Sequence, residues 1–438
     1  MKKTKFNYMW IIIGLCFLMV FSTLGFCSST KSIFTPAIIE AFEDTGMTRS
    51  AFALNDSFRF VTTAIVNLFF GLLIVRMGTK KMICAGIFSL IAAVLVYAVA
   101  NNVYMFYLGG TLLGVGFAWT GTTMVGSVVN KWCPEKRGTV MGFILAANGL
   151  GGALAQKIVD GIIRSNAQDA FGYRKAYYII AVILAAVLLV FVFFFKDNPK
   201  GHDGLIPSDS TPAKKKKRGQ AWEGIAFDTV VKMPLFYVTV VCIFFTGFVL
   251  AGINNVASTH MKVQVFTGDT TGFVATVLSV HSIALAGFKF LTGFLYDKRG
   301  LRFTMVMCSI AAMLSMLSLA PMTATPLGKA LAFFWGIVSS LALPLETVMV
   351  PIYAADLFGD KSFSQALGLF VSVNTAGMAL GGPTMHAIFD LTGSYVPAFI
   401  LGATVMLCTM ITMLFVIKIG AKRREEIIAA SEATVNKE

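Results

Sequence analysis

The sequence predicts an all-α membrane protein, with twelve transmembrane helices in two pseudo-symmetric six-helix bundles. Three observations predict this fold class. The 438 residues are 56% hydrophobic and only 13% charged, which is about half the charged share of an average soluble domain. Apolar runs of about 20 residues, each long enough to cross a bilayer, recur along the whole chain. One long polar segment divides these runs six and six, and backbone in lipid must be helical to satisfy its hydrogen bonds.

The apolar runs set the expected spans in chain order. They lie near residues 8–33, 52–75, 82–100, 104–130, 138–163, 175–195, 234–257, 271–296, 303–321, 329–353, 363–388 and 395–419. After the sixth span comes KDNPKGHDGLIPSDSTPAKKKKRGQ, which is polar, cationic and rich in proline and glycine, as linkers are. We therefore expect an N-terminal bundle over 1–196, a cytoplasmic linker over 197–232, a C-terminal bundle over 233–420 and a cytoplasmic tail over 421–438.

Lysine and arginine are distributed unevenly over the connecting segments. Most of the 36 fall in alternate segments on the same side as both termini, and the positive-inside rule makes that side cytoplasmic. This bias explains most of the net charge of +14 without a nucleic-acid partner. The KKKKR run, Lys214–Arg218, is expected to attract anionic lipid headgroups. We expect a multi-pass protein of the cell (inner) membrane with both termini cytoplasmic.

The sequence does not indicate an enzyme, a metal site or a cofactor. The seven cysteines are scattered, mostly in apolar runs, without metal-ligand spacing, so they are expected to be small buried hydrophobes. The sequence contains no G-x-x-x-x-G-K-[ST] stretch, so ATP is not expected to drive the protein. No tail or span indicates oligomerisation, and a monomer is expected.

Two pairs of similar stretches indicate an internal repeat. GLLIVRMGTKK (Gly71–Lys81) resembles GFLYDKRGLRF (Gly293–Phe303), and both end the second span of their half. GFILAAN (Gly142–Asn148) resembles GLFVSVN (Gly368–Asn374) in the same way. The halves therefore read as parallel copies, and repeats of this kind predict a substrate site near the membrane midplane between them.

The second copy of the loop carries a G-x-x-x-D-x-x-G-x-R pattern at Gly293, Asp297, Gly300 and Arg302. This pattern resembles the loop motif of the major facilitator superfamily, and the twelve spans, central loop and repeat extend the resemblance over nearly the whole chain. The resemblance implies the major facilitator fold and a gating role for Asp297 and Arg302, which are expected to pair at the inner mouth and separate when it opens. The first copy departs from the motif, because Val75 stands where the acid is expected.

Ionisable residues inside spans are costly and are therefore candidates for function. They are Lys31, Asp56, Arg59, Lys157, Asp160, His281, Lys289, Glu346 and His386. Asp56 and Arg59 stand one helical turn apart and are expected to pair, with an anion-binding role for Arg59 left open. Lys157 and Asp160 have the same spacing near the outer end of the fifth span, where long side chains reach the interface easily, and they are expected to be structural. His281 and His386 are expected to make structural hydrogen bonds more readily than to carry protons.

Lys31, Lys289 and Glu346 have no opposite charge one turn away. Lys289 is expected to face water or a partner on another helix. Glu346 either neutralises a lysine across the bundle or carries a proton, and Asp56 and His281 are further proton-coupling candidates. Two unpaired lysines, one in each half, suit a site that binds an anion.

Three stretches resemble the monocarboxylate transporters and the related oxalate/formate antiporters within the superfamily. Lys31, Ser32 and Ile33 match a K-S-I stretch that supplies a cavity lysine in that family, and Lys289 four residues before Gly293 matches its span-eight cation. SSLALPLETVMVPIY is similar to the family's tenth span. The resemblance implies that Lys31 and Lys289 bind a carboxylate.

Three departures narrow what this resemblance implies. Leu285 replaces the family's acid four residues before the span-eight cation, which leaves Glu346 or Lys31 for coupling. The eleventh span, 363–388, has no lysine or arginine, which favours a monocarboxylate over a dicarboxylate. Lys289 in place of the usual arginine also loses bidentate geometry.

The expected function is secondary active transport of organic anions, above all monocarboxylates, by alternating access with proton symport or anion exchange. Cavity walls are expected to include Asn148, Asn254, Asn374 and Trp119, with packing roles left open for each. The alternative is a proton-coupled drug exporter of the same fold. That alternative is weaker because Ala147 and Asn148 stand where such exporters carry a Gly-Pro pair.

Overall fold

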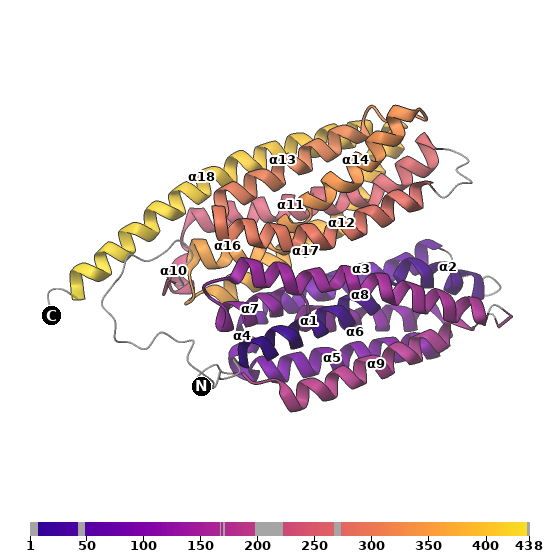
Figure 1. The fold of residues 1–438 in the computed structure, drawn as a ribbon, viewed down its shortest axis with the longest axis horizontal. Helices are drawn as coiled ribbons and strands as arrows, with labels where there is room; N and C mark the ends of the chain where they lie inside the picture. Colours follow the sequence, from indigo (N-terminus) through magenta and orange to yellow (C-terminus); the bar gives the residue numbers. More distant parts are fainter. Residues whose placement is uncertain are drawn as a thin grey trace, which may run out of the picture. The chain divides into compact units, whose positions relative to one another are not determined.

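The computed structural model describes residues 8–42, 49–166, 168–169, 171–197, 222–266 and 273–435. Within these residues every regular element is helical (Figure 1). The chain forms two compact units, Met1–Arg218 and Gly219–Glu438. The expected all-helical membrane fold is confirmed.

The N-terminal unit contains nine helices in its described residues. They are α1 (Tyr8–Cys27), α2 (Lys31–Ala41), α3 (Arg49–Leu68), α4 (Phe70–Met77), α5 (Thr79–Val99), α6 (Val103–Thr120), α7 (Thr122–Trp132), α8 (Arg137–Ser165) and α9 (Tyr173–Phe194).

The described part of the C-terminal unit contains a similar series. It consists of α10 (Phe227–Val230), α11 (Pro234–Thr259), the π-helix η2 (His260–Val265), α12 (Phe273–Arg299), α13 (Leu301–Leu319), α14 (Pro326–Ala342), α15 (Pro344–Thr347), α16 (Met349–Phe358), α17 (Phe363–Thr392) and α18 (Val396–Val435).

Eleven helices of the described residues are long and apolar enough to cross a membrane, and one bent pair makes a twelfth. The bent pair is Leu54–Leu68 with Phe70–Met77, and its two parts meet at 63°. The second expected span is therefore bent rather than straight. The tenth span divides at Pro344, because proline has no N–H to continue the helical ladder.

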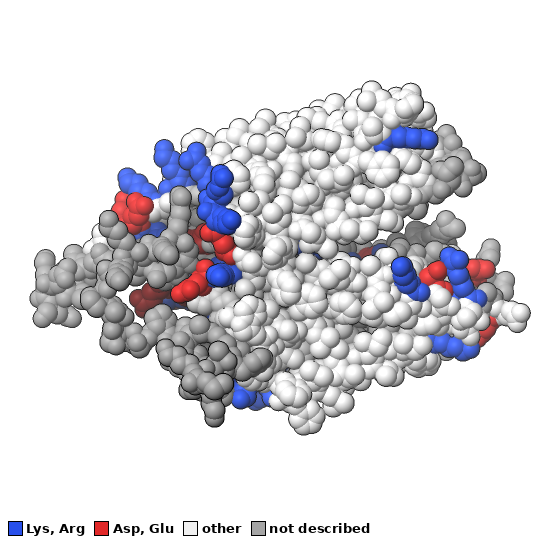
Figure 2. Space-filling view, viewed as in Figure 1, with Lys and Arg blue, Asp and Glu red and all other residues white. Residues whose placement is uncertain are grey.

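The outward surfaces of the helices are apolar. Phe88, Val182, Phe193, Ile283 and Phe415 are all more than half exposed, which suits contact with lipid tails as apolar as leucine itself. Figure 2 shows that the charged side chains on the face in view gather toward the helix ends, with a broad uncharged band between them. A bilayer would cover this band.

The helices pack in the same pattern in both units, as the sequence repeat predicts. In the N-terminal unit α1 packs on α8 and α9, α5 lies against α6 and α9, and α3 packs on α6. In the C-terminal unit α11 packs on α17 and α18, α13 lies against α14 and α18, and α12 packs on α14. Each unit therefore builds its frame from equivalent helices.

Glycines allow the close crossing of the first and fifth long helices in each unit. A Cβ placed on Gly25 of α1 would lie 2.7 Å from the backbone of Gly151 in α8. A Cβ placed on Gly252 of α11 would lie 3.0 Å from the backbone of Gly381 in α17. Small residues at such crossings let helix backbones approach in membranes.

The two repeated loops also share their turn. Gly78 stands between α4 and α5, and Gly300 stands between α12 and α13, each with φ of +81°. Their ψ values of 160° and 176° fall in a region that is essentially restricted to glycine. The same sharp turn is therefore made at the same place in both copies.

Part of the expected linker belongs to the C-terminal unit. Residues 222–226 lie along the turn between α16 and α17. The N–H of Ile225 donates to the carbonyl of Phe358 (3.0 Å), and the N–H of Lys361 donates to the carbonyl of Glu223 (2.9 Å). Trp222 is buried, and its indole N–H donates to the carbonyl of Ala355 (3.3 Å). Residues 198–221, with the Lys214–Arg218 run, lie outside the described residues.

Candidate functional site

Lys31 begins α2, directly after the break that ends α1 at Cys27. Its Nζ makes an ion pair with Asp56 of α3, and half of its side chain remains exposed (50%). The expectation that Lys31 is unpaired is therefore wrong. The reason is that its partner stands on another helix, where spacing along one helix cannot reveal it.

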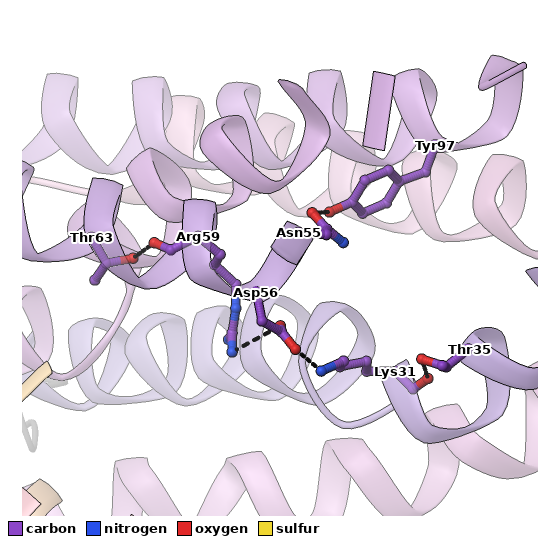
Figure 3. A network of polar contacts seen from close by, with 7 residues as sticks. All are labelled: Lys31, Thr35, Asn55, Asp56, Arg59, Thr63 and Tyr97. Atoms are coloured by element: carbon purple, nitrogen blue, oxygen red, sulfur yellow. Dashed lines mark hydrogen bonds and ion pairs between the residues drawn. The ribbon is translucent and has the colours of Figure 1, made fainter. Parts of the chain in front are cut away.

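Asp56 also pairs with Arg59, as the one-turn spacing predicts, at 3.2 Å between Oδ1 and Nη2 (Figure 3). One carboxylate therefore serves two cations, and these three groups together carry one surplus positive charge. The Nε of Arg59 is buried and has no hydrogen-bond partner in the described part of the chain. The guanidinium also lies 5.7 Å from the ring centroid of Phe117.

Neighbouring polar groups fix α3, the helix that carries Asp56 and Arg59. The hydroxyl of Tyr97 in α5 donates to Asn55 Oδ1 at 2.9 Å (Figure 3). Thr63 donates to the carbonyl of Arg59 at 2.8 Å and stands 3.0 Å from the carbonyl of Gly114 in α6. These bonds hold α3 against α5 and α6, so Asp56 and Arg59 start from a rigid support, and Lys31 reaches Asp56 from α2.

The cluster borders a cavity of about 60 Å³ inside the N-terminal unit. Besides Lys31, Asp56 and Arg59, aromatic rings contribute much of its lining: Phe26, Phe34, Phe52, Tyr97 and Tyr177. These rings and Asn55 were not predicted as site residues from the sequence. Tyr97 within an apolar run could have indicated a polar partner nearby, since a buried tyrosine hydroxyl usually finds one.

The charged side chains of the C-terminal unit are arranged differently. Lys289 of α12 is only 6% exposed. It interacts electrostatically with Glu346 of α15, but no ion pair within 4.0 Å joins them among the described residues. Glu346 Oε2 is buried and has no hydrogen-bond partner in the same residues. Glu346 therefore interacts with a lysine across the bundle, as one of the two alternatives predicted, but the two side chains do not form an ion pair.

Asn374 of α17 lies beside Glu346. Its amide nitrogen donates to the carbonyl of Glu346 at 3.3 Å, while its Oδ1 is buried without a partner in the described chain. Lys289, Glu346 and Asn374 thus form a polar cluster of the C-terminal unit.

The remaining expected wall residues make local contacts. Asn148 accepts a hydrogen bond from Ser29 at 3.4 Å, close to the α1–α2 break. Asn254 donates to the carbonyl of Leu250 in its own helix at 2.9 Å. The indole nitrogen of Trp119 is buried without a partner among the described residues.

The two span histidines named from the sequence, His281 and His386, make hydrogen bonds, as expected for structural roles. His281 Nδ1 lies 3.0 Å from the carbonyl of Gly336 and 2.9 Å from the hydroxyl of Ser340, and its ring stacks on Trp335. His386 Nδ1 lies 2.9 Å from the hydroxyl of Tyr395.

Asp160 pairs with Arg164 at 2.9 Å rather than with Lys157. An i,i+4 partner was present that the i,i+3 reading overlooked.

Asp297 and Arg302 stand on either side of the turn at Gly300. Asp297 lies in the last turn of α12, and the exposed Arg302 is the second residue of α13. No group of three or more His, Cys, Asp or Glu side chains suited to a metal occurs in the described residues.

Comparisons with known proteins agree with this architecture. The profile of the family described as Major Facilitator Superfamily matches residues 11–351. An uncharacterized MFS-type transporter of Bacillus subtilis strain 168, YcxA, is 23% identical over 398 residues, covering 90% of this chain and 91% of that protein. The multidrug resistance protein MdtG of Salmonella schwarzengrund is 26% identical over 363 residues, covering 80% and 81%. The Escherichia coli fucose:proton symporter FucP has the same fold, with a TM-score of 0.71 at 16% identity over 94% of this chain and 99% of that one.

Proposed function

This chain belongs to the major facilitator superfamily and is a membrane transporter, not an enzyme, and from that premise we propose that it carries small organic anions, above all monocarboxylates. The observation that supports this substrate class is the surplus positive charge of Lys31, Asp56 and Arg59 beside a cavity. A monoanion would neutralise that surplus.

The geometry of Arg59 supports the same substrate class. One arm of its guanidinium is held by Asp56, and its buried Nε has no partner in the described residues. A buried donor without a partner costs about 1–3 kcal/mol. A carboxylate oxygen at this position removes that cost and gains a charge-assisted hydrogen bond. Lys31, half exposed at the cavity, supplies the second contact.

We place coupling in the C-terminal unit, at Glu346. Asp56 is already engaged by two cations, and His281 is engaged by a backbone carbonyl and serine hydroxyls. Glu346 keeps a buried oxygen without a partner among the described residues, and Lys289 lies near enough to sense its charge. Proton symport through Glu346 is the coupling mode that we favour over anion exchange.

The other expected site residues have supporting roles in this proposal. Lys289, Asn374, Asn148, Asn254 and Trp119 contact the solute during the alternating-access cycle. Asp297 and Arg302 form the gate. The protein acts as a monomer in the cell (inner) membrane, with both termini in the cytoplasm.

The test is carboxylate uptake by purified full-length protein in liposomes, with propionate as the solute. Lys31→Ala and Arg59→Ala are each expected to weaken apparent affinity by about tenfold or more, because a hydrogen bond to a charged group contributes about 1.5–3 kcal/mol. Lys157→Ala is the matched control, since Lys157 is exposed and makes no ion pair among the described residues. Wild-type affinity in both site variants rejects the proposal.

Coupling is measured in the same liposomes. Glu346→Gln is expected to abolish uptake driven by a proton gradient while exchange of internal for external propionate continues. Loss of both activities would instead assign Glu346 to solute binding or to the fold.

A second candidate function is drug export, and the likeness to MdtG favours it. If a drug is the solute, deletion of the gene changes susceptibility to that drug, and carboxylate uptake by the purified protein is absent.

A further inference from the structure

A groove on the surface of the C-terminal unit lies between its helices α11 and α18. It has a volume of about 500 Å³ and is lined by side chains from residues 237–245 of α11 and 404–412 of α18. Both helices are long and apolar enough to cross a membrane. Each stretch rises about 12 Å along its helix, so the groove covers less than half of a hydrocarbon core of about 30 Å.

The two helices touch at both ends of this groove. A Cβ placed on Gly420 of α18 would lie 3.9 Å from Cδ2 of Leu235 in α11. A Cβ placed on Gly402 of α18 would lie 3.3 Å from Cγ1 of Val249 in α11. In both helices the lining residues fall between these two contacts. The hollow is therefore fixed by the packing of α11 on α18.

The surface of the groove is almost entirely apolar. The hydroxyls of Thr404, Thr409 and Thr412 donate to carbonyls of their own helix, at 2.9, 2.8 and 2.8 Å. Tyr237 lies at the end of the groove near the start of α11, and tyrosine is typical of the headgroup level of a bilayer. A hydrocarbon chain fits this lining.

Basic side chains lie just beyond the same end of the groove. Lys232 is exposed and stands just before α11 begins at Pro234. Arg423 is exposed and follows Thr412 by about three turns and about 16 Å on the same face of α18. Its Cα–Cβ bond tilts back toward the groove, as in every helix. Neither Lys232 nor Arg423 makes an ion pair in the described part of the chain.

We propose that the groove binds an acyl chain of one anionic phospholipid, whose phosphate is held by Lys232 and Arg423. The exposed apolar side chains of Phe415 and Ile419 continue the path from the groove to Arg423. Arginine pairs with a phosphate through two parallel hydrogen bonds, and basic side chains near the membrane surface attract anionic lipids. This site uses none of the residues of the proposed solute site.

The charge at this end of α18 favours a lipid over a second copy of the chain. Residues 418–426 include four basic and two acidic side chains. Two copies that faced each other in one membrane would bring these basic ends side by side, where they would repel. An anionic headgroup instead neutralises part of their charge.

The test is native mass spectrometry of the purified full-length protein, with equal amounts of phosphatidylglycerol and phosphatidylethanolamine that carry the same acyl chains. Phosphatidylglycerol has a net negative charge, whereas phosphatidylethanolamine has none. The first phosphatidylglycerol is expected to bind at least about tenfold more tightly, because each basic residue near an anionic headgroup contributes about a factor of five. Equal binding of the two lipids overturns the proposal, and this comparison needs no variant.

Lys232→Gln/Arg423→Gln tests the headgroup contacts. This double variant is expected to bind phosphatidylglycerol no better than phosphatidylethanolamine. Lys81→Gln/Lys136→Gln is the matched control, because it removes two exposed cations of the N-terminal unit that make no ion pair among the residues that the structure describes. A preference that survives in the Lys232/Arg423 variant overturns the assignment of the headgroup to these residues.

Val241→Trp tests the groove itself. Val241 lines the groove and is 52% exposed, so an indole there fills the hollow and is expected to abolish the first binding event of either lipid. Val182→Trp is the control, because Val182 is an exposed residue of α9 in the other unit. Unchanged lipid binding in Val241→Trp overturns the groove as the chain site. A dimer that Val241→Trp removes would assign the groove to a second copy and also overturn the proposal.

Discussion

In the N-terminal unit, Lys31 and Arg59 make direct ion pairs with one acid beside a cavity, whereas in the C-terminal unit Lys289 and Glu346 stay apart in a buried setting. The helices that carry Arg59 and Lys289, α3 and α12, occupy equivalent places in the two packing frames. The two units therefore share their helix packing but differ in how their charged groups are paired. In the N-terminal unit, Lys31 is paired yet half exposed, so it can contact a solute. In the C-terminal unit, Lys289 and Glu346 are not paired, and the charge of each affects the other.

The largest expected effect concerns the buried charged groups of the C-terminal unit, Lys289 and Glu346. Lys289→Met removes the positive charge nearest the buried Glu346 carboxylate and is expected to lower the free energy of unfolding by about 3 kcal/mol, because a buried charge is left uncompensated. The double variant Lys289→Met/Glu346→Gln is expected to recover most of that loss. Thermal unfolding in detergent measures both.

Lys31→Met is the matched change in the other unit. It is expected to cost less than about 1 kcal/mol, since half of the Lys31 side chain is exposed. Equal losses at Lys289 and Lys31 would contradict the distinction between the two clusters.

A second prediction concerns what the two units share. Gly151→Val in α8 and Gly377→Val in α17 place a side chain against the backbone of Phe21 and of Phe244. Each is expected to cost about 2 kcal/mol through overpacking, with similar values in both units. Gly14→Val is the control, since a Cβ on Gly14 of α1 meets no atom within 4 Å. A large loss in only one unit would show that the frames differ.

The smallest expected effect concerns exposed pairs, one in each unit. Asp160→Asn breaks the pair with Arg164, and Glu223→Gln breaks the pair with Lys361. Each should change the free energy of unfolding by less than about 0.5 kcal/mol, because exposed ion pairs contribute little. A loss above about 1 kcal/mol at either site would show that burial does not explain the different stability effects expected at Lys31 and Lys289.

The repeated features of the fold were predictable from sequence, because they depend on local rules. Apolar length indicated the spans, and the two loop motifs placed Gly78 and Gly300 at equivalent turns that the structure makes alike. One-turn spacing also indicated the Asp56–Arg59 pair. In each of these cases the deciding residues are neighbours along the chain or along one helix.

The parts of the candidate site that the sequence did not reveal depend on contacts between helices. Lys31 meets Asp56 across two helices, and Tyr97, Tyr177 and Phe34 come together from α5, α9 and α2. A pattern that repeats along one helix cannot report which residue faces it from another. The break of the tenth span does not depend on contacts between helices, because Pro344 is a local signal for it in the sequence.

The binding of residues 222–226 to the α16–α17 turn affects how the two halves can be made as separate polypeptides. Because Trp222, Glu223 and Ile225 are bonded to the C-terminal unit, a gene split for co-expression should be divided upstream of Trp222. A split at the start of α11 would assign this strip to the wrong fragment and leave the turn at Gly359 without its backbone partners.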